Sequence, residues 1–134
     1  SILTHWPREM SRNRNPRRDN SPTDRGKRGE ALAADYLLRE GYTILEKNFR
    51  RRTGEVDIVC ERSGNIVFAE VKRWPRAFRS ELNIALSSRR RERLRRTAEL
   101  FLLERPEFRK QQVRFDLLFV ATGGGEIEHI PGAL

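Results

Sequence analysis

Three carboxylates and one amine lie in a segment whose other residues are typical of a buried β-hairpin. The segment is GEVDIVCERSGNIVFAEVKRW, residues 54–74, and its four central charges belong to Glu55, Asp57, Glu70 and Lys72. Carboxylates that converge can hold a divalent cation, since Mg²⁺ prefers oxygen ligands. A lysine beside them can orient an attacking water or stabilise charge that develops on a phosphate. The pattern therefore predicts metal-assisted chemistry on a phosphate ester.

The turn of this hairpin decides which side chains share a face. A two-residue turn at Ser63-Gly64 places all four charges on one face, because glycine supplies the positive φ such a turn needs. In that register Asp57 faces Glu70 and Glu55 faces Lys72. The opposite face is wholly apolar, since it pairs Val56 with Val71, Ile58 with Ala69 and Cys60 with Val67. A turn at Gly64-Asn65 keeps the same faces but pairs Asp57 with Lys72, so the pairing partner stays open.

Two carboxylates side by side on a strand pair repel each other. On a half-buried face the cost rises, because desolvation disfavours both ionised forms. A bound Mg²⁺, or Mn²⁺ in its place, would remove the conflict. The alternative interpretation is a surface ladder in which Glu55 pairs with Lys72 while Asp57 and Glu70 are solvated.

The positive charge of the chain is concentrated next to the hairpin. The net charge is +9 and the sequence pI is about 10.9. Residues 71–96 hold ten Lys or Arg and two Glu, a local charge of ten minus two, or +8. This balance favours a polyanionic partner, above all nucleic acid, over an ordinary solvated helix face. The side chains expected to contact nucleic acid are Arg73, Arg76, Arg89, Arg90, Arg91 and Arg93.

The length of 134 residues suits one domain with one core. Residues 1–24 predict a flexible basic arm, and residues 25–134 a single domain. The periodicity predicts helices over 27–40 and 81–104 and, besides the hairpin, strands over 42–49, 113–121 and 126–130. The buried stripe of the second helix is expected to be Leu94, Ala98, Phe101 and Leu102. The fold class is therefore α/β, a mixed central sheet with helices packed against its faces.

The remaining titratable residues predict structural roles. Cys60 is the one cysteine, so neither an intramolecular disulfide nor a cysteine zinc cluster is expected. Asp116 lies in an apolar strand beside Arg114 and is expected to form an ion pair with it. His129 is expected to pack at an edge strand rather than to act in catalysis. With no apolar run long enough to span a membrane, the protein is expected to be soluble and cytoplasmic.

A longer pattern carries a resemblance to a known family. The segments GKRGEALAADYLLREGYTILEKNFRRRTGEVDIVC, IVFAEVK, RFDLLFV and IEHIPGAL resemble the YraN-type uncharacterised family, UPF0102, from about residue 26 to the end of the chain. That family is assigned to the restriction-endonuclease-like superfamily, whose signature is PD-(D/E)xK, and is similar to archaeal Holliday-junction resolvases. The resemblance implies an α-βββ-α-β core.

The resemblance also implies roles for individual residues. Asp57 and Glu70 would bind the metal, Lys72 would be the catalytic lysine, Glu30 would add to the metal site, and Glu55 would support the ligands from outside them. Two departures are the segment RWPRAF after Lys72, and Arg90 where the family usually has lysine. Arginine keeps affinity for phosphate but not the point-donor geometry of lysine.

The activity implied is that of a Mg²⁺-dependent DNA endonuclease, a phosphodiester hydrolase acting on branched, recombination or repair intermediates. Similarity to resolvases predicts a symmetric homodimer, since two strands must be cut. The first alternative is a non-catalytic nucleic-acid-binding module on the same fold. The second is an interaction domain whose basic face meets an acidic protein.

Overall fold

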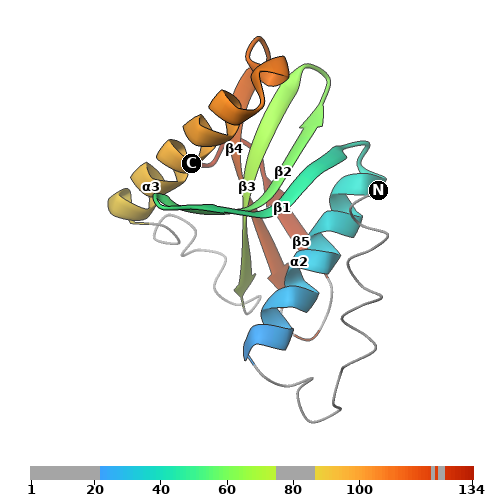
Figure 1. Ribbon diagram of the computed structural model, residues 1–134. Coiled ribbons are helices and arrows are strands. Elements are labelled where there is room, and N and C mark those ends of the chain that lie inside the picture. Colours follow the sequence, from blue (N-terminus) through green and yellow to red (C-terminus); the bar gives the residue numbers. More distant parts are fainter. Residues whose placement is uncertain (1–21, 75–86, 122, 124–125) are drawn as a thin grey trace, which may run out of the picture.

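The described part of the chain forms a five-stranded sheet with one long helix on each face (Figure 1). The computed structural model describes residues 22–74, 87–121, 123 and 126–134, of which 22–26 and 74 are described by their backbone alone. Its elements are α2 (Pro22–Arg39), β1 (Thr43–Arg51), β2 (Gly54–Arg62), β3 (Asn65–Trp74), α3 (Ser88–Glu104), the 3₁₀ turn η3 (Pro106–Phe108), β4 (Gln112–Ala121) and β5 (Ile127–Ile130).

The strands lie in chain order across the sheet, β1-β2-β3-β4-β5. Three neighbouring pairs are antiparallel, whereas β3 and β4 are parallel. A parallel neighbour requires a crossover connection, and α3 lies in that connection. The sheet is therefore mixed, and the order of elements confirms the predicted α/β class with its α-βββ-α-β core.

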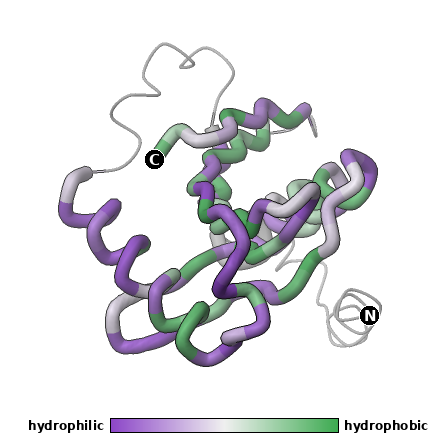
Figure 2. Tube along the Cα trace, turned by 90° about the horizontal axis from the view of Figure 1, so that it is seen from above, coloured by the Kyte–Doolittle hydropathy of each residue, from purple (hydrophilic) through white to green (hydrophobic). Residues whose placement is uncertain are grey.

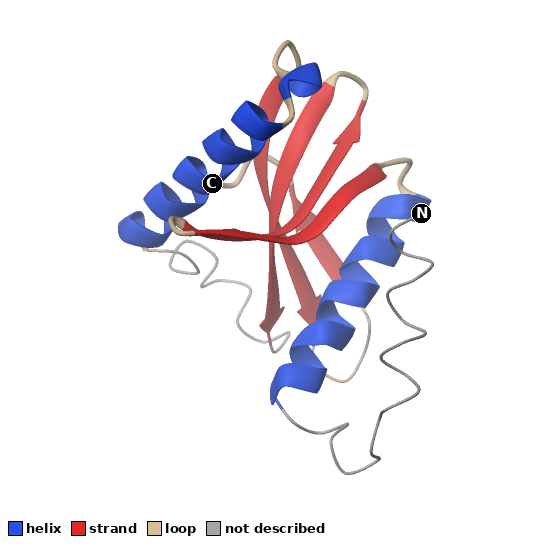
Figure 3. Ribbon diagram, in the orientation of Figure 1, coloured by secondary structure: helices blue, strands red, loops and turns tan. Residues whose placement is uncertain are grey.

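Two separate hydrophobic clusters attach the helices to the sheet. On one face Ala33, Ala34 and Leu37 of α2 pack against strand residues that include Ile58 and Leu118. On the other face the α3 residues Leu94, Ala98 and Phe101 pack against strand residues that include Phe68. Figure 3 shows the sheet between the two helices, and Figure 2 shows the first turns of α3 as strongly hydrophilic. The strands therefore form the buried middle layer.

The β2–β3 turn has the predicted register. Ser63 and Gly64 both have positive φ, +53° and +81°, as a two-residue type I′ turn requires. Ile58 pairs with Ala69 and Val59 with Phe68, as the Ser63-Gly64 turn predicts. The alternative turn at Gly64-Asn65 is wrong.

One part of the predicted apolar face is wrong. Val71 packs on the α2 side as expected, but Val56 packs with Phe49 in the cluster under α3. The physical reason lies in β1, where Asn48 has φ +55° and interrupts the regular alternation of the strand. Phe49 and its partner Val56 turn together onto the α3 side, so Val56 and Val71 do not form a pair.

Both helices differ from the predicted boundaries. The first begins at Pro22, a position where proline is favoured because it has no N–H to leave unbonded. Residues 22–24 of the predicted arm are thus helical, and residues 1–21 lie outside the described residues. The second helix begins at Ser88 rather than 81, because Ser87 is extended (φ −72°, ψ 163°) and its side chain accepts the Arg90 N–H. Leu102 is only partly buried, and Thr97 takes a buried place in the stripe instead.

Candidate active site

The site lies at a fork where β2 and β3 part. From their turn the two strands are paired as far as Ile58 and Ala69. Beyond that point the first residues of β2 pair only with β1, and the last residues of β3 pair only with β4. Asp57 and Glu70 are the residues that directly follow the last pair, one on each arm of the fork. Their side chains therefore lie where the sheet opens, between the two helices.

Asp57 is held by the other arm of the fork. The backbone N–H of Val71 donates a hydrogen bond to Asp57 Oδ2 at 2.8 Å. This side-chain bond replaces the strand pairing that the sequence predicts between Asp57 and Glu70. Burial first, and then the charge of Glu70, raise the pKa of Asp57 to about 8, although the Val71 hydrogen bond acts in the opposite direction. The repulsion between the two carboxylates, expected from the sequence, is therefore present.

Glu70 is almost completely buried, with 4% of its side chain exposed, and two cations meet one of its oxygens. Lys72 Nζ lies 3.7 Å from Oε2, and Nη2 of Arg90, in the first turn of α3, donates to the same atom. The structure thus brings Asp57, Glu70 and Lys72 together beside the arginine-rich helix. The sequence-based prediction of a metal site depends on this convergence.

Glu55 and Glu30 lie further out. Glu55 faces Arg50 of β1 and hydrogen-bonds to it at 3.0 Å, so it does not pair with Lys72 as the predicted register implied. Glu30 reaches toward the fork from α2 and accepts a hydrogen bond from Asn48. Burial raises the pKa of Glu30, and the charges of Glu55 and Glu70 add to this effect. Glu30 is therefore in the electrostatic field of the site.

The carboxylate set of the site is small. Among the residues that the structure describes, no three His, Cys, Asp or Glu side chains are grouped closely enough to hold one metal ion. Asp57 and Glu70 remain as an adjacent pair, and one or two carboxylates with waters suffice for Mg²⁺ in many sites. A metal role for Glu30 stays a prediction.

A cavity of about 360 Å³ opens beside the two carboxylates. One wall is the turn between β1 and β2, and the other is the first half of α3. The lining residues are Arg52, Thr53, Gly54, Glu55, Asp57, Glu70, Arg90, Arg93 and Leu94. Among these residues Glu70 is buried whereas Arg52, Arg90 and Arg93 are exposed, so the deep part of the cavity is acidic and its rim is basic.

Hydrogen bonds fix the two walls of this cavity to each other. The hydroxyl groups of Thr53 and Thr97 lie 2.6 Å apart, and Thr97 also donates to the Arg93 carbonyl at 2.8 Å. Gly54 approaches α3 closely, since a Cβ there would lie 3.4 Å from Thr97 Oγ1. Arg51 adds an ion pair to Glu104 at 2.5 Å. The width of the cavity is set by these contacts.

The predicted nucleic-acid-binding arginines fall into three groups. Arg90 and Arg93 line the cavity, and Arg89 and Arg91 lie beside them at the start of α3. Arg73 lies instead against α2, where its Cγ comes within 3.0 Å of a Cβ placed on Gly29. Arg76 lies outside the described residues.

The wall of the cavity that lies opposite α3 was not predicted from the sequence. Arg52 and Thr53 lie in the turn before the hairpin and were given no role, although the run Arg50-Arg51-Arg52 was a visible signal. Thr97 was missed as well, because a threonine in a helix carries no signal of the partner it will meet. The turn and the helix form one site only after folding.

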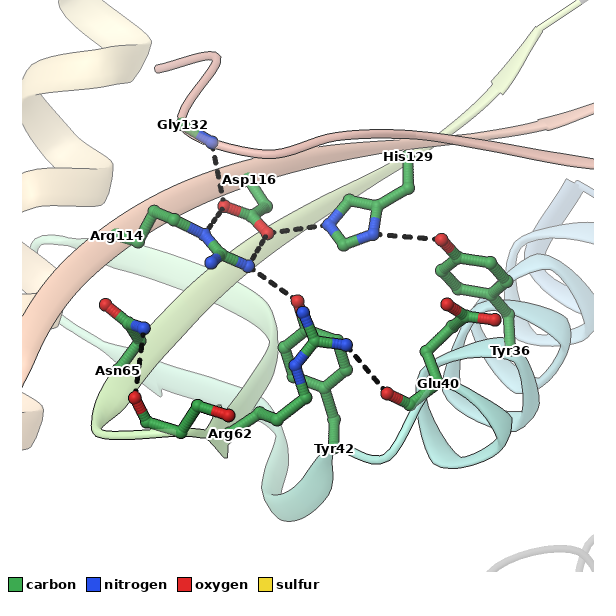
Figure 4. A network of polar contacts seen from close by, with 10 residues as sticks. Tyr36, Glu40, Tyr42, Arg62, Asn65, Arg114, Asp116, His129 and Gly132 are labelled. Carbon is green, nitrogen blue, oxygen red and sulfur yellow. Dashed lines mark hydrogen bonds and ion pairs between the residues drawn. The ribbon is translucent and has the colours of Figure 1, made fainter.

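A second polar cluster lies on the α2 side of the sheet and is structural (Figure 4). Arg114 holds both oxygens of the fully buried Asp116 at 2.8 Å, which confirms the predicted ion pair. His129 Nε2 lies 2.6 Å from Asp116 Oδ2, and the Tyr36 hydroxyl lies 3.0 Å from His129 Nδ1. Burial opposes ionisation of Asp116, but hydrogen bonds from His129, Arg114 and the Gly132 N–H outweigh it and lower its pKa to about 2. His129 therefore packs between β4 and α2.

The fold and the site define an α/β protein that places two carboxylates and a lysine at a fork in its sheet. The profile of the Uncharacterised protein family UPF0102 matches residues 29–120. The chain belongs to this family, as the resemblance indicated.

Relatives from distant bacteria match over most of both chains. A "UPF0102 protein" of Syntrophomonas wolfei is 41% identical over 107 residues, 78% of this chain and 92% of its own. "UPF0102 protein RPA0323" of Rhodopseudomonas palustris is 38% identical over 108 residues, 81% of each chain. A "UPF0102 protein" of Persephonella marina is 37% identical over 109 residues, 81% of this chain and 91% of its own. Their names state no activity. None of the described helices is long and apolar enough to cross a membrane.

Proposed function

We propose that the protein is a metal-dependent nuclease that hydrolyses phosphodiester bonds in DNA, with Mg²⁺ or Mn²⁺ as cofactor. One observation carries the proposal. Asp57 and Glu70 lie side by side at the fork, Lys72 contacts Glu70, and the cavity above them is rimmed by arginines. Two carboxylates that can hold a metal, a lysine, and arginines that can bind phosphate thus lie in one place.

The donor set fits a hard divalent cation. Burial and the charge of Glu70 raise the pKa of Asp57 to about 8, a penalty that a bound cation offsets. Held by Asp57 and Glu70, Mg²⁺ would supply Lewis acidity toward a phosphate oxygen and toward water. The Val71 hydrogen bond and the burial of Glu70 hold both carboxylates in place without it.

The other residues act on the substrate side of the site. Lys72 Nζ is partly exposed and can donate a hydrogen bond to the attacking water or to a phosphate oxygen. Arg52 and Arg93 approach the cavity from its two walls and can bind phosphates that flank the cleaved one. The substrate class that we propose is branched or recombination and repair DNA, cut by a homodimer, with the cytoplasm as the compartment.

A second function, binding of nucleic acid without hydrolysis, is favoured by a different observation. Arg90 and Lys72 both contact Oε2 of Glu70 and offset its charge. A site that is electrostatically complete in this way binds a metal weakly. Calorimetric titration with Mg²⁺ and Mn²⁺ separates the two functions, because only the nuclease requires a binding isotherm that disappears in Asp57→Asn.

Cleavage assays test the first proposal. Labelled branched, duplex and single-stranded DNA, with RNA in parallel, are incubated with the protein and Mg²⁺ or Mn²⁺. Cleavage is expected to disappear in Asp57→Asn and Lys72→Ala and to persist in Glu99→Gln and Lys110→Ala, which remove the same charges from exposed positions. Equal cleavage by all four variants would overturn the site, and no cleavage of any substrate would overturn the activity.

A further inference from the structure

Arg90 makes a contact that a nucleic-acid-binding arginine does not need. Its guanidinium, on a side chain that is 47% exposed, reaches from the first turn of α3 to the buried carboxylate of Glu70. The neighbouring Arg93 lines the same cavity, yet among the described residues it has no ion pair with either carboxylate. The two arginines therefore differ in their contact with Glu70 although they share one wall.

Arg90 occupies one of the two oxygens with which Glu70 would hold a metal. A carboxylate oxygen that accepts from a guanidinium has a cation in the same position in which a divalent ion would lie. Arginine cannot lose its proton in proteins, so the guanidinium is always charged when it makes this contact. A divalent cation bound at Glu70 Oε2 would therefore compete with Arg90 for that oxygen.

The guanidinium of Arg90 has a second possible binding partner, a phosphate at the rim of the cavity. The rim of the cavity, on which Arg52 and Arg93 lie, is where a phosphate would bind, and a guanidinium is well matched to phosphate geometry. The side chain of Arg90 is half-exposed, and it lines the same cavity as Arg52 and Arg93 while it contacts the buried carboxylate. Any event that occupies or neutralises Glu70 leaves the guanidinium available to phosphate.

We infer that Arg90 alternates between Glu70 and a phosphate of the nucleic acid, so that metal and nucleic acid each promote binding of the other. The inference rests on the proposed function for the identity of both ligands. It goes beyond it by naming the residue that couples them, since coupling between two ligands is reciprocal. A purely structural Arg90–Glu70 ion pair predicts no such coupling.

The first test is a metal-free mutant cycle. Binding of a fluorescent DNA duplex is measured by anisotropy in EDTA for the wild type, Arg90→Ala, Glu70→Gln and the double variant, with Arg93→Ala and Glu70→Gln/Arg93→Ala as matched controls. Glu70→Gln is expected to tighten binding about fivefold or more, because it releases Arg90. Arg90→Ala alone is expected to change the affinity less than twofold, whereas Arg93→Ala weakens it.

The double variants decide the inference. In the Arg90→Ala background, Glu70→Gln is expected to give no gain in DNA affinity. In the Arg93→Ala background, Glu70→Gln is expected to give the same gain as in the wild type. Additive effects of Glu70→Gln and Arg90→Ala would overturn the inference. Thermal unfolding of each variant shows whether it is folded at the assay temperature, and Glu70→Asp, which also withdraws the acceptor oxygen, repeats the cycle if Glu70→Gln is not.

The second test measures the metal directly. In calorimetric titrations with Mn²⁺ and no nucleic acid, Arg90→Ala is expected to bind about fivefold more tightly than the wild type. Arg93→Ala removes the same charge from the same cavity without vacating Glu70, so its gain is expected to be much smaller. Equal gains would reduce the effect to general electrostatics and overturn the inference.

The two proposals fail separately. A protein that binds DNA and shows the cycle but never cleaves keeps the coupling and loses the nuclease activity. If the protein cleaves DNA but the effects of Glu70→Gln and Arg90→Ala on DNA affinity are additive, the activity is kept and the coupling is lost. A protein that binds no DNA loses both.

Discussion

The Val71 N–H donates to Asp57 Oδ2 at 2.8 Å, across the point where β2 and β3 part. A carboxylate of one strand is thereby fixed to the backbone of the other, one residue beyond Glu70. The separation of the two acids is set by the main chain and not by flexible side chains. The cost of this placement is that Glu70 is buried, Asp57 is partly buried, and the two acids repel each other, which gives the first prediction.

Asp57→Asn should stabilise the metal-free protein. The pKa of Asp57 is raised to about 8, so the folded state holds this proton more tightly than the unfolded state does. The resulting stabilisation is complete below the ordinary pKa of an aspartate and is lost as the pH rises through about 8. Asparagine carries no charge and can still accept the Val71 N–H. We expect Asp57→Asn to unfold at a temperature about 4 °C or more above the wild type at pH 9.

Thermal unfolding in EDTA from pH 5 to 9 checks this prediction. The difference between the two proteins should widen as the pH rises. Glu99→Gln, an exposed carboxylate on α3, should follow the wild type throughout. A difference that is constant over this range would mean that Asp57 is ionised in the folded protein at every pH tested.

Gly54→Ala should damage both stability and the cavity. Gly54 has φ +146°, a conformation that side chains rarely adopt, and a Cβ would lie 3.4 Å from Thr97 Oγ1 and 3.6 Å from Arg93 Cβ. We expect a loss of about 1–3 kcal/mol in the free energy of unfolding. The strained residue belongs to the wall of the cavity, so the affinity for DNA should fall as well.

Gly64→Ala is the matched control for that experiment. Gly64 also has a positive φ, +81°, but no atom lies within 4 Å of its Cβ position, and it forms the distant β2–β3 turn. Urea unfolding should show a loss of stability in both variants. Fluorescence anisotropy should show weaker DNA binding in Gly54→Ala alone, and an equal loss in the two would contradict the proposed role of the β1–β2 turn.

The register of the β2–β3 hairpin could be predicted because it depends on local signals. The Ser63-Gly64 turn and the alternation of Ile58, Cys60, Val67 and Ala69 determine it together. The fork could not be predicted, because where two strands part depends on their other neighbours, β1 and β4. The same cause explains the position of Val56. Its side chain lies on the α3 side of the sheet because Asn48, in the neighbouring strand β1, has a left-handed backbone conformation.

For the charged residues too, contacts within the hairpin could be predicted and contacts with other elements could not. Asp57, Glu70 and Lys72 could be predicted as a group because they share one hairpin. Glu55 was assigned the wrong partner, since the nearer cation is Arg50 of β1. The contact between Arg90 and Glu70 joins two elements through residues 75–86, which lie outside the described residues, so no spacing in the sequence indicates it. Composition predicted a basic helix but not which arginine turns inward.

Asp116→Asn should destabilise the protein strongly. Asp116 is fully buried and holds Arg114, His129 and the Gly132 N–H. Removing one partner of a buried ion pair leaves the other uncompensated, at a cost of about 3–5 kcal/mol. Because the folded pKa is lowered to about 2, the stabilisation is present above the ordinary pKa of an aspartate and is lost as the pH falls toward 2.

Urea unfolding at pH 7 and pH 3 checks both parts of this prediction. The gap between the wild type and Asp116→Asn should be large at pH 7 and smaller at pH 3. Asp35→Asn, an exposed position on α2, should show no comparable loss at pH 7. A gap that does not shrink in acid would show that the charge of Asp116 is not what stabilises this cluster.

Arg52→Ala should weaken DNA binding through a lost phosphate contact. Arg52 lines the cavity from the β1–β2 turn, opposite the arginines of α3, and its side chain is exposed. Loss of one phosphate contact lowers affinity for all sequences alike and reduces the slope of log K against log salt by about 1. Anisotropy titrations between low and physiological salt measure that slope.

Arg109→Ala removes the same charge from an exposed position after η3, beyond the other end of α3. The two variants have equal net charge, so a general effect of charge would lower both slopes together. We expect the Arg109→Ala slope to stay at the wild-type value while that of Arg52→Ala falls. Identical slopes in the two variants would place the DNA path elsewhere than between the β1–β2 turn and α3.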